Sequence, residues 1–163
     1  MDLRAKQSGD VLDEATGQPL PPLLLDLAER ARQAQALAYA PYSRFPVGAA
    51  LLTSDGRVFV GANVENASYG LTVCAERTAV FAAVLAGAHR LSAIAICTNL
   101  NPPAAPCGMC RQTLAEFAED ADVVLLSPHG TARLTKLSTL LPLAFRPNAL
   151  IAAAEKDPDG NGK

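Results

Sequence analysis

Cys107 and Cys110 lie three residues apart in the segment PCGMC, at the predicted start of a helix. Residues i and i+3 share one face of a helix, so both sulfurs can reach one metal ion. The positive end of the helix dipole also favours the thiolate forms that zinc requires. On its own, such a pair is compatible with a redox pair, a structural zinc site or chance.

A third cysteine, Cys74, also stands at a predicted helix start and is followed two residues later by Glu76. Because residues i and i+2 do not share a helix face, Glu76 is expected to point beside a metal held by Cys74 rather than bind it. Three protein ligands leave a fourth position open for water, as in catalytic zinc sites. Glu76 can then remove or deliver the proton of that water. The pattern predicts a catalytic zinc site formed by Cys74, Cys107 and Cys110.

A closed four-cysteine zinc site and plain buried cysteines are the structural alternatives. Cys97 lies in an apolar run with no second cysteine beside it, where a free cysteine commonly packs as a small hydrophobe. His89 and His129 stand near predicted turns and are interpreted as exposed turn residues. The open site with three cysteines is therefore the favoured interpretation.

Alternating helices and strands are expected to position these residues. Helices are predicted over residues 23–40, 75–87 and 107–120. Strands are predicted from residue 47 and from residue 58, joined by a turn at Asp55-Gly56, and over 91–98, 122–128 and 131–137. This order implies a mixed sheet between layers of helices.

The chain has 163 residues, of which 50% are hydrophobic and 18% are charged, which predicts one folded domain. Its 14 basic and 16 acidic side chains give a net charge of −2, which argues against a nucleic-acid partner. No apolar run approaches the roughly 18 residues of a membrane span, so no membrane partner is expected. The opening segment MDLRAKQSGD lacks the apolar core of a secretory signal, and a cytoplasmic location is expected.

Four motifs together resemble the small homotetrameric zinc-dependent cytidine deaminases. They are FPVGAA at residues 45–50, NVENASYG at 63–70, CAERTA at 74–79 and PCGMCRQ at 106–112. The likeness runs from about Leu24 to Phe145, with the blocks in family order and at family-like gaps. Residues 23–150 are thus expected to form the catalytic domain, between a flexible arm over 1–22 and a loose tail over 151–163.

The resemblance implies a three-layer α/β/α sandwich with a five-stranded mixed sheet and one zinc ion per chain. It implies hydrolysis of cytidine and 2′-deoxycytidine to uridine and 2′-deoxyuridine plus ammonia, in pyrimidine salvage. Glu76 is expected to act as base and then as acid, because the proton taken early is needed later.

The same resemblance assigns substrate contacts to four residues. Asn63 and Glu65 alternate in an extended stretch, so their side chains point the same way, and they are expected to bind the ribose hydroxyls. Phe45 is expected beside the pyrimidine ring, and the backbone of Ala75 at the base edge. Residue type alone favours solvated polar side chains for the first pair and core packing for the phenylalanine.

Arg77 is expected to offset the charge of the sulfurs. Zinc with three thiolates sums to 2 − 3 = −1, which makes it a poor electrophile. An adjacent arginine that hydrogen-bonds a sulfur draws charge from the metal. The alternative is a surface arginine, which the apolar neighbours along the helix disfavour.

Tyr69 and Phe145 are expected, by resemblance, to reach the active site of a neighbouring subunit in a homotetramer. In the segment that ends at Phe145, the family's usual Gly-Ala-Phe is replaced by Leu143-Ala144-Phe145. The leucine puts the turn before Phe145 in question.

Three other functions share part of this pattern. A blasticidin-type nucleoside deaminase shares the zinc motifs but not the full NVENAS block. A polynucleotide deaminase would need a basic surplus that this chain lacks. A non-catalytic zinc module of the same fold would not need Glu76 beside the three cysteines.

Overall fold

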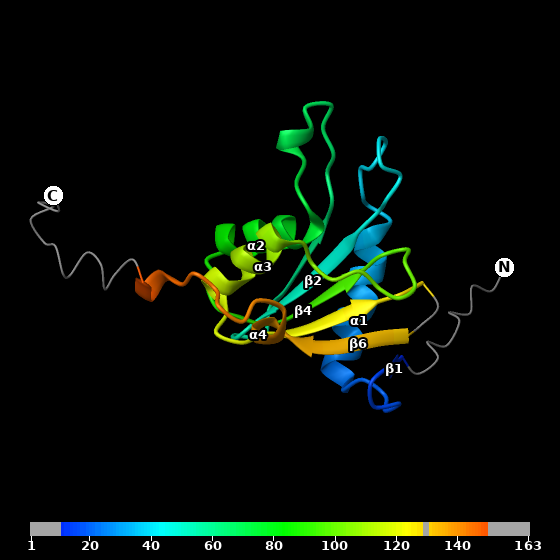
Figure 1. Ribbon diagram of the computed structural model, residues 1–163, viewed down its shortest axis with the longest axis vertical. Helices are drawn as coiled ribbons and strands as arrows, with labels where there is room; N and C mark the ends of the chain where they lie inside the picture. Colours follow the sequence, from blue (N-terminus) through cyan, green and yellow to red (C-terminus); the bar gives the residue numbers. More distant parts are fainter. Residues whose placement is uncertain (1–10, 129–130, 150–163) are drawn as a thin grey trace, which may run out of the picture.

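The computed structural model describes residues 11–128 and 131–149. A six-stranded mixed sheet, in the order β1-β6-β5-β4-β2-β3, forms its centre (Figure 1). The strands are β1 (Leu12–Asp13), β2 (Gly48–Thr53), β3 (Val58–Ala62), β4 (Leu91–Cys97), β5 (Asp122–Leu126) and β6 (Thr131–Lys136). Strand pairs β4–β5 and β1–β6 are parallel, and the other neighbours are antiparallel.

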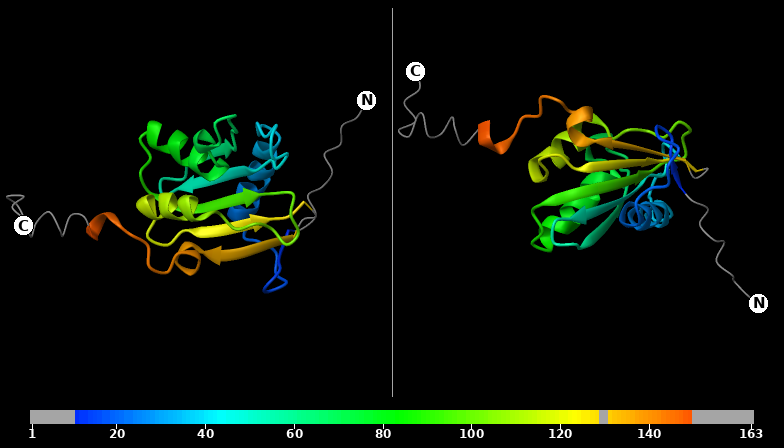
Figure 2. Two further views of the ribbon diagram at one scale, coloured as in Figure 1. Left: turned by 45° about the horizontal axis from the view of Figure 1, so that its top comes forward. Right: turned by 90° about the horizontal axis from the view of Figure 1, so that it is seen from below.

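Helices cover both faces of this sheet (Figures 1 and 2). Helix α1 (Pro22–Gln35) packs on one face. Helices α2 (Ala75–Leu85) and α3 (Gly108–Phe117) and the short α4 (Leu137–Leu140) pack on the other. A single 3₁₀ turn, η1 (Tyr69–Leu71), precedes α2. The predicted three-layer α/β/α sandwich is confirmed.

Successive side chains of the central strands enter two separate cores, as the period of two along a strand requires. Leu51 of β2 and Ile94 of β4 pack under α2 and α3. Their neighbours Leu52 and Ala95 pack under α1. Burial on both faces explains why these strands read as continuous apolar runs.

The sheet has six strands rather than the expected five, and the additional strand is β1. The buried Asp13 accepts a hydrogen bond from the backbone N–H of Leu134 at 3.1 Å, and Val11 and Leu20 enter the core under α1. A two-residue strand is too short to show a period in the sequence. Residues 11–13 and Leu20 of the expected flexible arm thus pack against the sheet or its core, and residues 14–19 are exposed. Residues 1–10 and the expected tail over 151–163 lie outside the described residues.

Helix α1 ends at Gln35, five residues before the expected end of its helical pattern. The following chain pairs instead with the segment after β3. The backbone N–H of Tyr39 donates to the carbonyl of Asn63 at 2.9 Å, and its carbonyl accepts from Glu65 at 2.8 Å. Tertiary pairing therefore overrides local helix propensity here.

Within residues 11–128 and 131–149, no helix is long and apolar enough to cross a membrane.

Two glycines let helix ends lie directly on strands. A Cβ at Gly48 would stand 2.1 Å from the carbonyl oxygen of Ala31 and 2.3 Å from the nitrogen of Gln35. A Cβ at Gly61 would stand 2.4 Å from the carbonyl oxygen of Ala75, in the first turn of α2. Only glycine permits these approaches, which place the end of α1 and the start of α2 against the sheet.

Candidate active site

The N-termini of α2 and α3 bring three sulfurs together. Cys74 and Cys107 are the N-cap residues of these helices, and Cys110 lies in the first turn of α3. All three sulfurs lie within 4.8 Å of one another, with 4.0 Å between those of Cys74 and Cys107. Sulfurs around a tetrahedral zinc at about 2.3 Å stand about 3.8 Å apart. The donor set therefore fits one zinc ion.

Cys97 is not part of this cluster. It is buried on the opposite face of the sheet, where its thiol donates to Oε1 of Gln35 at 3.5 Å. No fourth cysteine, histidine or carboxylate joins the three sulfurs within the described chain. His89 is exposed, and His129 lies outside the described residues. This arrangement fits an open site rather than a closed one.

Neighbouring donors concentrate negative charge on the sulfur of Cys74. Hydrogen bonds from Cys110, and then from Arg77 and Cys107, lower the pKa of Cys74 to about 5. The same interaction and burial raise the pKa of Cys110. Nη2 of Arg77 lies 3.8 Å from the sulfur of Cys74 and 3.2 Å from the carbonyl oxygen of Thr72. Arg77 thus faces the cluster and is only partly exposed, rather than lying free on the surface.

Glu76 lies beside the sulfurs and outside the metal-binding group. It is the second residue of α2 and is only 5% exposed. Burial, supported by the negative charge of Cys74, raises its pKa above the ordinary value. A carboxyl group with a raised pKa is suited to accept and return a proton near neutral pH.

A cavity of about 250 Å³ is lined by Cys74, Glu76 and Cys107. Four further predicted site residues line it, namely Phe45, Asn63, Glu65 and Ala75. These residues come from segments that are far apart in the sequence, and the fold brings them to one place. The remaining lining residues are Ser43, Val47, Thr72, Ile96, Thr98, Ala104 and Ala105.

The amide of Asn63 holds the backbone of the chain segment that carries Phe45. Its Oδ1 accepts from the N–H of Val47 at 2.8 Å, and its Nδ2 donates to the carbonyl of Phe45 at 3.0 Å. The side chain is only 8% exposed. Asn63 is therefore ordered by specific contacts and is not the solvated turn residue that its type alone favoured.

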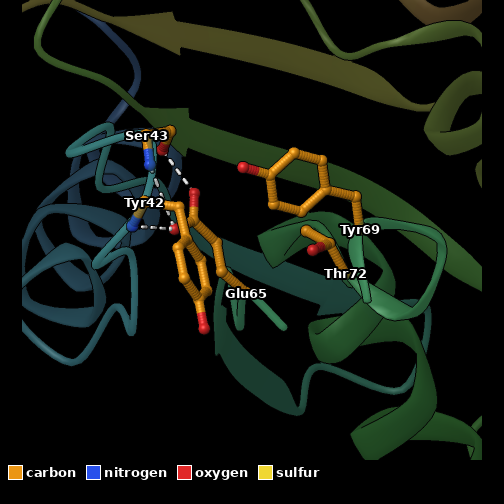
Figure 3. Close-up of a pocket in the computed structure, with 5 residues that line it drawn as sticks. All are labelled: Tyr42, Ser43, Glu65, Tyr69 and Thr72. Atoms are coloured by element: carbon orange, nitrogen blue, oxygen red, sulfur yellow. Dashed lines mark hydrogen bonds between the residues drawn. The ribbon is translucent and has the colours of Figure 1, made fainter. Parts of the chain in front are cut away.

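Glu65 holds the preceding residues in the same way (Figure 3). Its Oε2 accepts from the backbone N–H groups of Tyr42 at 2.8 Å and Ser43 at 3.2 Å, and its Oε1 accepts from the Ser43 hydroxyl. These hydrogen bonds lower the pKa of Glu65, and the bond from the Ser43 hydroxyl has the largest effect. The group is therefore a carboxylate at neutral pH. Asn63 and Glu65 together shape the wall that carries Phe45.

A second cavity, of about 350 Å³, shares part of its lining with the first (Figure 3). Tyr69 and Thr72 lie across it from Ser43 and Glu65. The ring of Tyr69 lies 6.0 Å from that of Tyr42 and is 74% exposed. Tyr69 therefore stands at the mouth of the site in its own chain, with most of its surface free.

Phe145 lies outside the lining of both cavities. It is 58% exposed, and its carbonyl accepts a hydrogen bond from Nε2 of Gln112 at 2.6 Å. Leu143, two residues earlier, is 94% exposed. The structure thus does not bring Phe145 to the site of its own chain.

Ser43 and Thr98 are among the lining residues that were not predicted from the sequence. Ser43 binds Glu65 and also accepts from the N–H of Phe45 at 3.0 Å. Thr98 is buried at the end of β4, and its hydroxyl accepts from Leu100 and Ala104 at 3.4 Å. A serine two residues before its partner is a local turn signal that could have been noticed. No sequence pattern marks Thr98.

Several known proteins are similar to this chain. A family model described as the cytidine and deoxycytidylate deaminase zinc-binding region matches residues 24–127. A cytidine deaminase of Halalkalibacterium halodurans is 52% identical over 120 residues, which are 73% of this chain and 91% of that protein. One of Sporosarcina psychrophila is 44% identical over 131 residues, which are 80% and 96% of the two chains. The crystal structure of a Burkholderia pseudomallei cytidine deaminase superposes with a TM-score of 0.72 at 52% identity, covering 74% of this chain and 98% of that one.

Proposed function

This chain belongs to the cytidine and deoxycytidylate deaminase zinc-binding family, and we infer that its three cysteines and Glu76 form the site of a hydrolytic deaminase. The enzyme catalyses zinc-dependent deamination of cytidine. One observation carries the assignment of the site. Glu76 and two of the three clustered cysteines, Cys74 and Cys107, line a single cavity, which is large enough for a small ligand.

Cys74, Cys107 and Cys110 would hold the zinc ion. When bound, zinc supplies a Lewis acid that lowers the pKa of water to near neutrality. The carboxylate of Glu76 takes the proton of the attacking water and delivers it to N3 of the pyrimidine. The water oxygen bonds to C4, and Glu76 then moves the second proton of that water to the amine, which departs as ammonia when the C4–N bond breaks. One cytidine and one water thus give one uridine and one ammonia.

The substrate we propose is a nucleoside rather than a nucleotide. Glu65, Glu76 and the sulfur of Cys74 give the cavity negative charge. Among the described residues that line the two cavities, none is lysine, arginine or histidine. A 5′-phosphate would add about two negative charges without a cation to bind it. The same reasoning disfavours a polynucleotide.

Glu65 retains a position for a sugar hydroxyl. A carboxylate offers about four acceptor positions, and the contacts to Tyr42 and Ser43 occupy three of them. We propose that the fourth accepts a hydroxyl of the sugar, with Phe45 beside the base. Because 2′-deoxycytidine keeps two of the three sugar hydroxyls of cytidine, we propose it as a second substrate.

We further propose a homotetramer in which Tyr69 and Phe145 serve a neighbour's site. The exposed ring of Phe145 and the exposed side chain of Leu143 support this proposal, because they leave apolar surface for a partner. All four cysteines are free, which fits the reducing conditions of the proposed cytoplasmic location. Salvage of pyrimidine nucleosides is the proposed role.

A steady-state assay tests the proposed function and its selectivity. The full chain loaded with zinc is incubated with cytidine, 2′-deoxycytidine, cytosine, cytidine 5′-monophosphate and blasticidin S, and the loss of absorbance and the release of ammonia are followed. Turnover of both nucleosides, with little turnover of the other three, is expected. Preferred turnover of the monophosphate or of blasticidin S would contradict the proposed substrate.

A further inference from the structure

Through its side chain, Gln35 hydrogen-bonds two segments that are far apart in the sequence, at Pro46 and at Cys97 and Asn99. It is the last residue of α1, which lies on the face of the sheet opposite the sulfurs. The absence of a side chain at Gly48 lets its backbone lie against β2. Its Nε2 donates to the carbonyl of Pro46 and to Oδ1 of Asn99, both at 3.0 Å. Its Oε1 accepts from the Cys97 thiol at 3.5 Å.

Two partners of Gln35, Pro46 and Asn99, belong to two separate segments that line the active-site cavity. Pro46 lies between Phe45 and Val47, which both line it. Asn99 follows Thr98, which lines the cavity. The hydroxyl of Thr98 accepts from the backbone of Ala104, in the loop that brings Ala104 and Ala105 to the same cavity. We call residues 43–47 the aromatic wall and residues 98–105 the loop wall. Gln35 is hydrogen-bonded to both.

The backbone of the aromatic wall is held from two directions. Asn63 binds the carbonyl of Phe45 and the N–H of Val47. The carbonyl between them, that of Pro46, is bound by Gln35. Pro46 has no N–H to donate. The two amide side chains thus fix the two peptide groups on either side of Pro46. Of these two side chains, Gln35 is the one that also binds the loop wall, through Asn99.

We propose that Gln35 is a positioning residue that sets the separation of the two walls and thereby the affinity for the nucleoside. The proposal rests on the proposed function, since a nucleoside is the ligand that the walls enclose. Gln35 has no hydrogen bond to Glu76 or to the sulfur cluster of Cys74, Cys107 and Cys110. These residues are held by α2 and α3 on the other face of the sheet. Its loss is therefore expected to weaken binding and to leave the chemical step intact.

The decisive variant is Gln35→Glu, which keeps the size of the side chain and removes both N–H donors. Asn99 can turn its own amide to meet a carboxylate, but the carbonyl of Pro46 cannot become a donor. The KM for cytidine should rise roughly tenfold, the size expected for the loss of about one net hydrogen bond, that to the carbonyl of Pro46. The value of kcat should stay within about threefold, and zinc content should not change. Calorimetric titration with uridine should show the same weakening.

Matched variants separate positioning from general damage. Gln33→Glu makes the same change on an exposed part of α1, where the amide contacts only Glu29 at 3.1 Å, and should leave KM unchanged. Asn99→Asp keeps the acceptor for Gln35 and should raise KM less than a variant without an acceptor. Asn99→Leu removes that acceptor and should raise KM by a few fold.

An unchanged KM and an unchanged uridine affinity in Gln35→Glu would overturn the proposal, even with a lower melting temperature. A roughly tenfold loss of kcat at unchanged KM would also overturn the proposal. Failure of the proposed function is a different result, because the wild-type protein would then deaminate no cytidine. Uridine titration of wild type and variant would still measure the positioning effect in that case.

Discussion

Helices α2 and α3 begin with the same backbone arrangement and carry different side chains. Each starts with a cysteine N-cap in extended conformation, with φ and ψ of −72° and 155° at Cys74 and of −66° and 166° at Cys107. Neither cap is satisfied by a side-chain hydrogen bond. Both sulfurs are therefore free to meet at the positive ends of two helix dipoles.

The second helical residue and the nearby arginine differ between the two helices. The second residue is the buried Glu76 in α2 and the exposed Met109 in α3. Arg77 reaches the sulfur of Cys74, whereas Arg111 donates to the carbonyls of Pro106 at 2.7 Å and Leu140 at 2.8 Å. Helix α2 thus carries the residues for which we propose proton transfer and charge compensation. Helix α3 supplies two sulfurs and holds the chain that leads to Phe145.

Loss of a sulfur should have the largest effect. Cys107→Ser removes one of three thiolates and should lose most of the zinc and, with it, the activity. Cys97→Ser is the matched control, since Cys97 lies on the other face of the sheet, and it should retain zinc. Metal analysis of both purified proteins checks this. Loss of zinc from Cys97→Ser would show that the site includes a fourth cysteine.

The next effect concerns the second helical residue. Glu76→Gln keeps the volume of the side chain but cannot accept a proton, so turnover should fall by roughly 10²-fold or more with zinc retained. Met109→Leu, at the equivalent position of α3, should have little effect. Comparable losses in both variants would remove the distinction between the two helices.

The pH dependence of the wild-type enzyme follows from the same residue. Burial raises the pKa of Glu76 above its ordinary 4.5, so the active carboxylate is lost on acidification at a higher pH than for an exposed glutamate. The acid limb of kcat should therefore lie above pH 4.5 and be absent from the residual activity of Glu76→Gln. An acid limb that persists in the variant would assign it to another group.

The two arginines should give different, smaller effects. Arg77→Ala should lower catalysis by about 10- to 100-fold and change zinc affinity, because it removes a hydrogen bond to a metal ligand. Arg77→Lys should be milder, since it keeps the charge. Arg111→Ala should lower the melting temperature and leave the zinc affinity nearly unchanged, because Arg111 binds two backbone carbonyls. Equal, mild effects of both Arg77 variants would favour a surface arginine.

The smallest effect is expected at the C-terminal segment. Phe145→Ala should weaken nucleoside binding by about tenfold or less, the size of one lost aromatic contact, while zinc remains bound. Leu143→Ala is the exposed control in the same segment and should alter KM less. Steady-state kinetics and light scattering check both variants. A fully active monomer would contradict a site shared between subunits.

The sulfur cluster was predictable because spacing along a helix decides which side chains meet. The i and i+3 rule placed Cys107 and Cys110 together, and the i and i+2 rule placed Glu76 beside Cys74. The roles of Asn63 and Glu65 in holding the aromatic wall were not predictable. Their hydrogen-bond partners lie 16 to 23 residues away and include backbone groups, which carry no residue-specific signal.

The strand count failed for a related reason. Pairing of β1 with β6 joins residues about 120 positions apart, and Leu12–Asp13 is too short for an alternating pattern. The layers were predictable because apolar runs such as 91–98 indicate strands that are covered on both faces. Long-range polar contacts and very short strands thus required the structure.

X-ray absorption at the zinc K edge of the loaded full-length protein tests the open three-thiolate site most directly. Three sulfur ligands at about 2.3 Å and one lighter ligand at about 2.0 Å are expected, because Cys74, Cys107 and Cys110 leave one position for water. The light ligand should remain in Cys97→Ser. Four sulfurs around the metal, with no light ligand, would contradict a catalytic site at the start of these two helices.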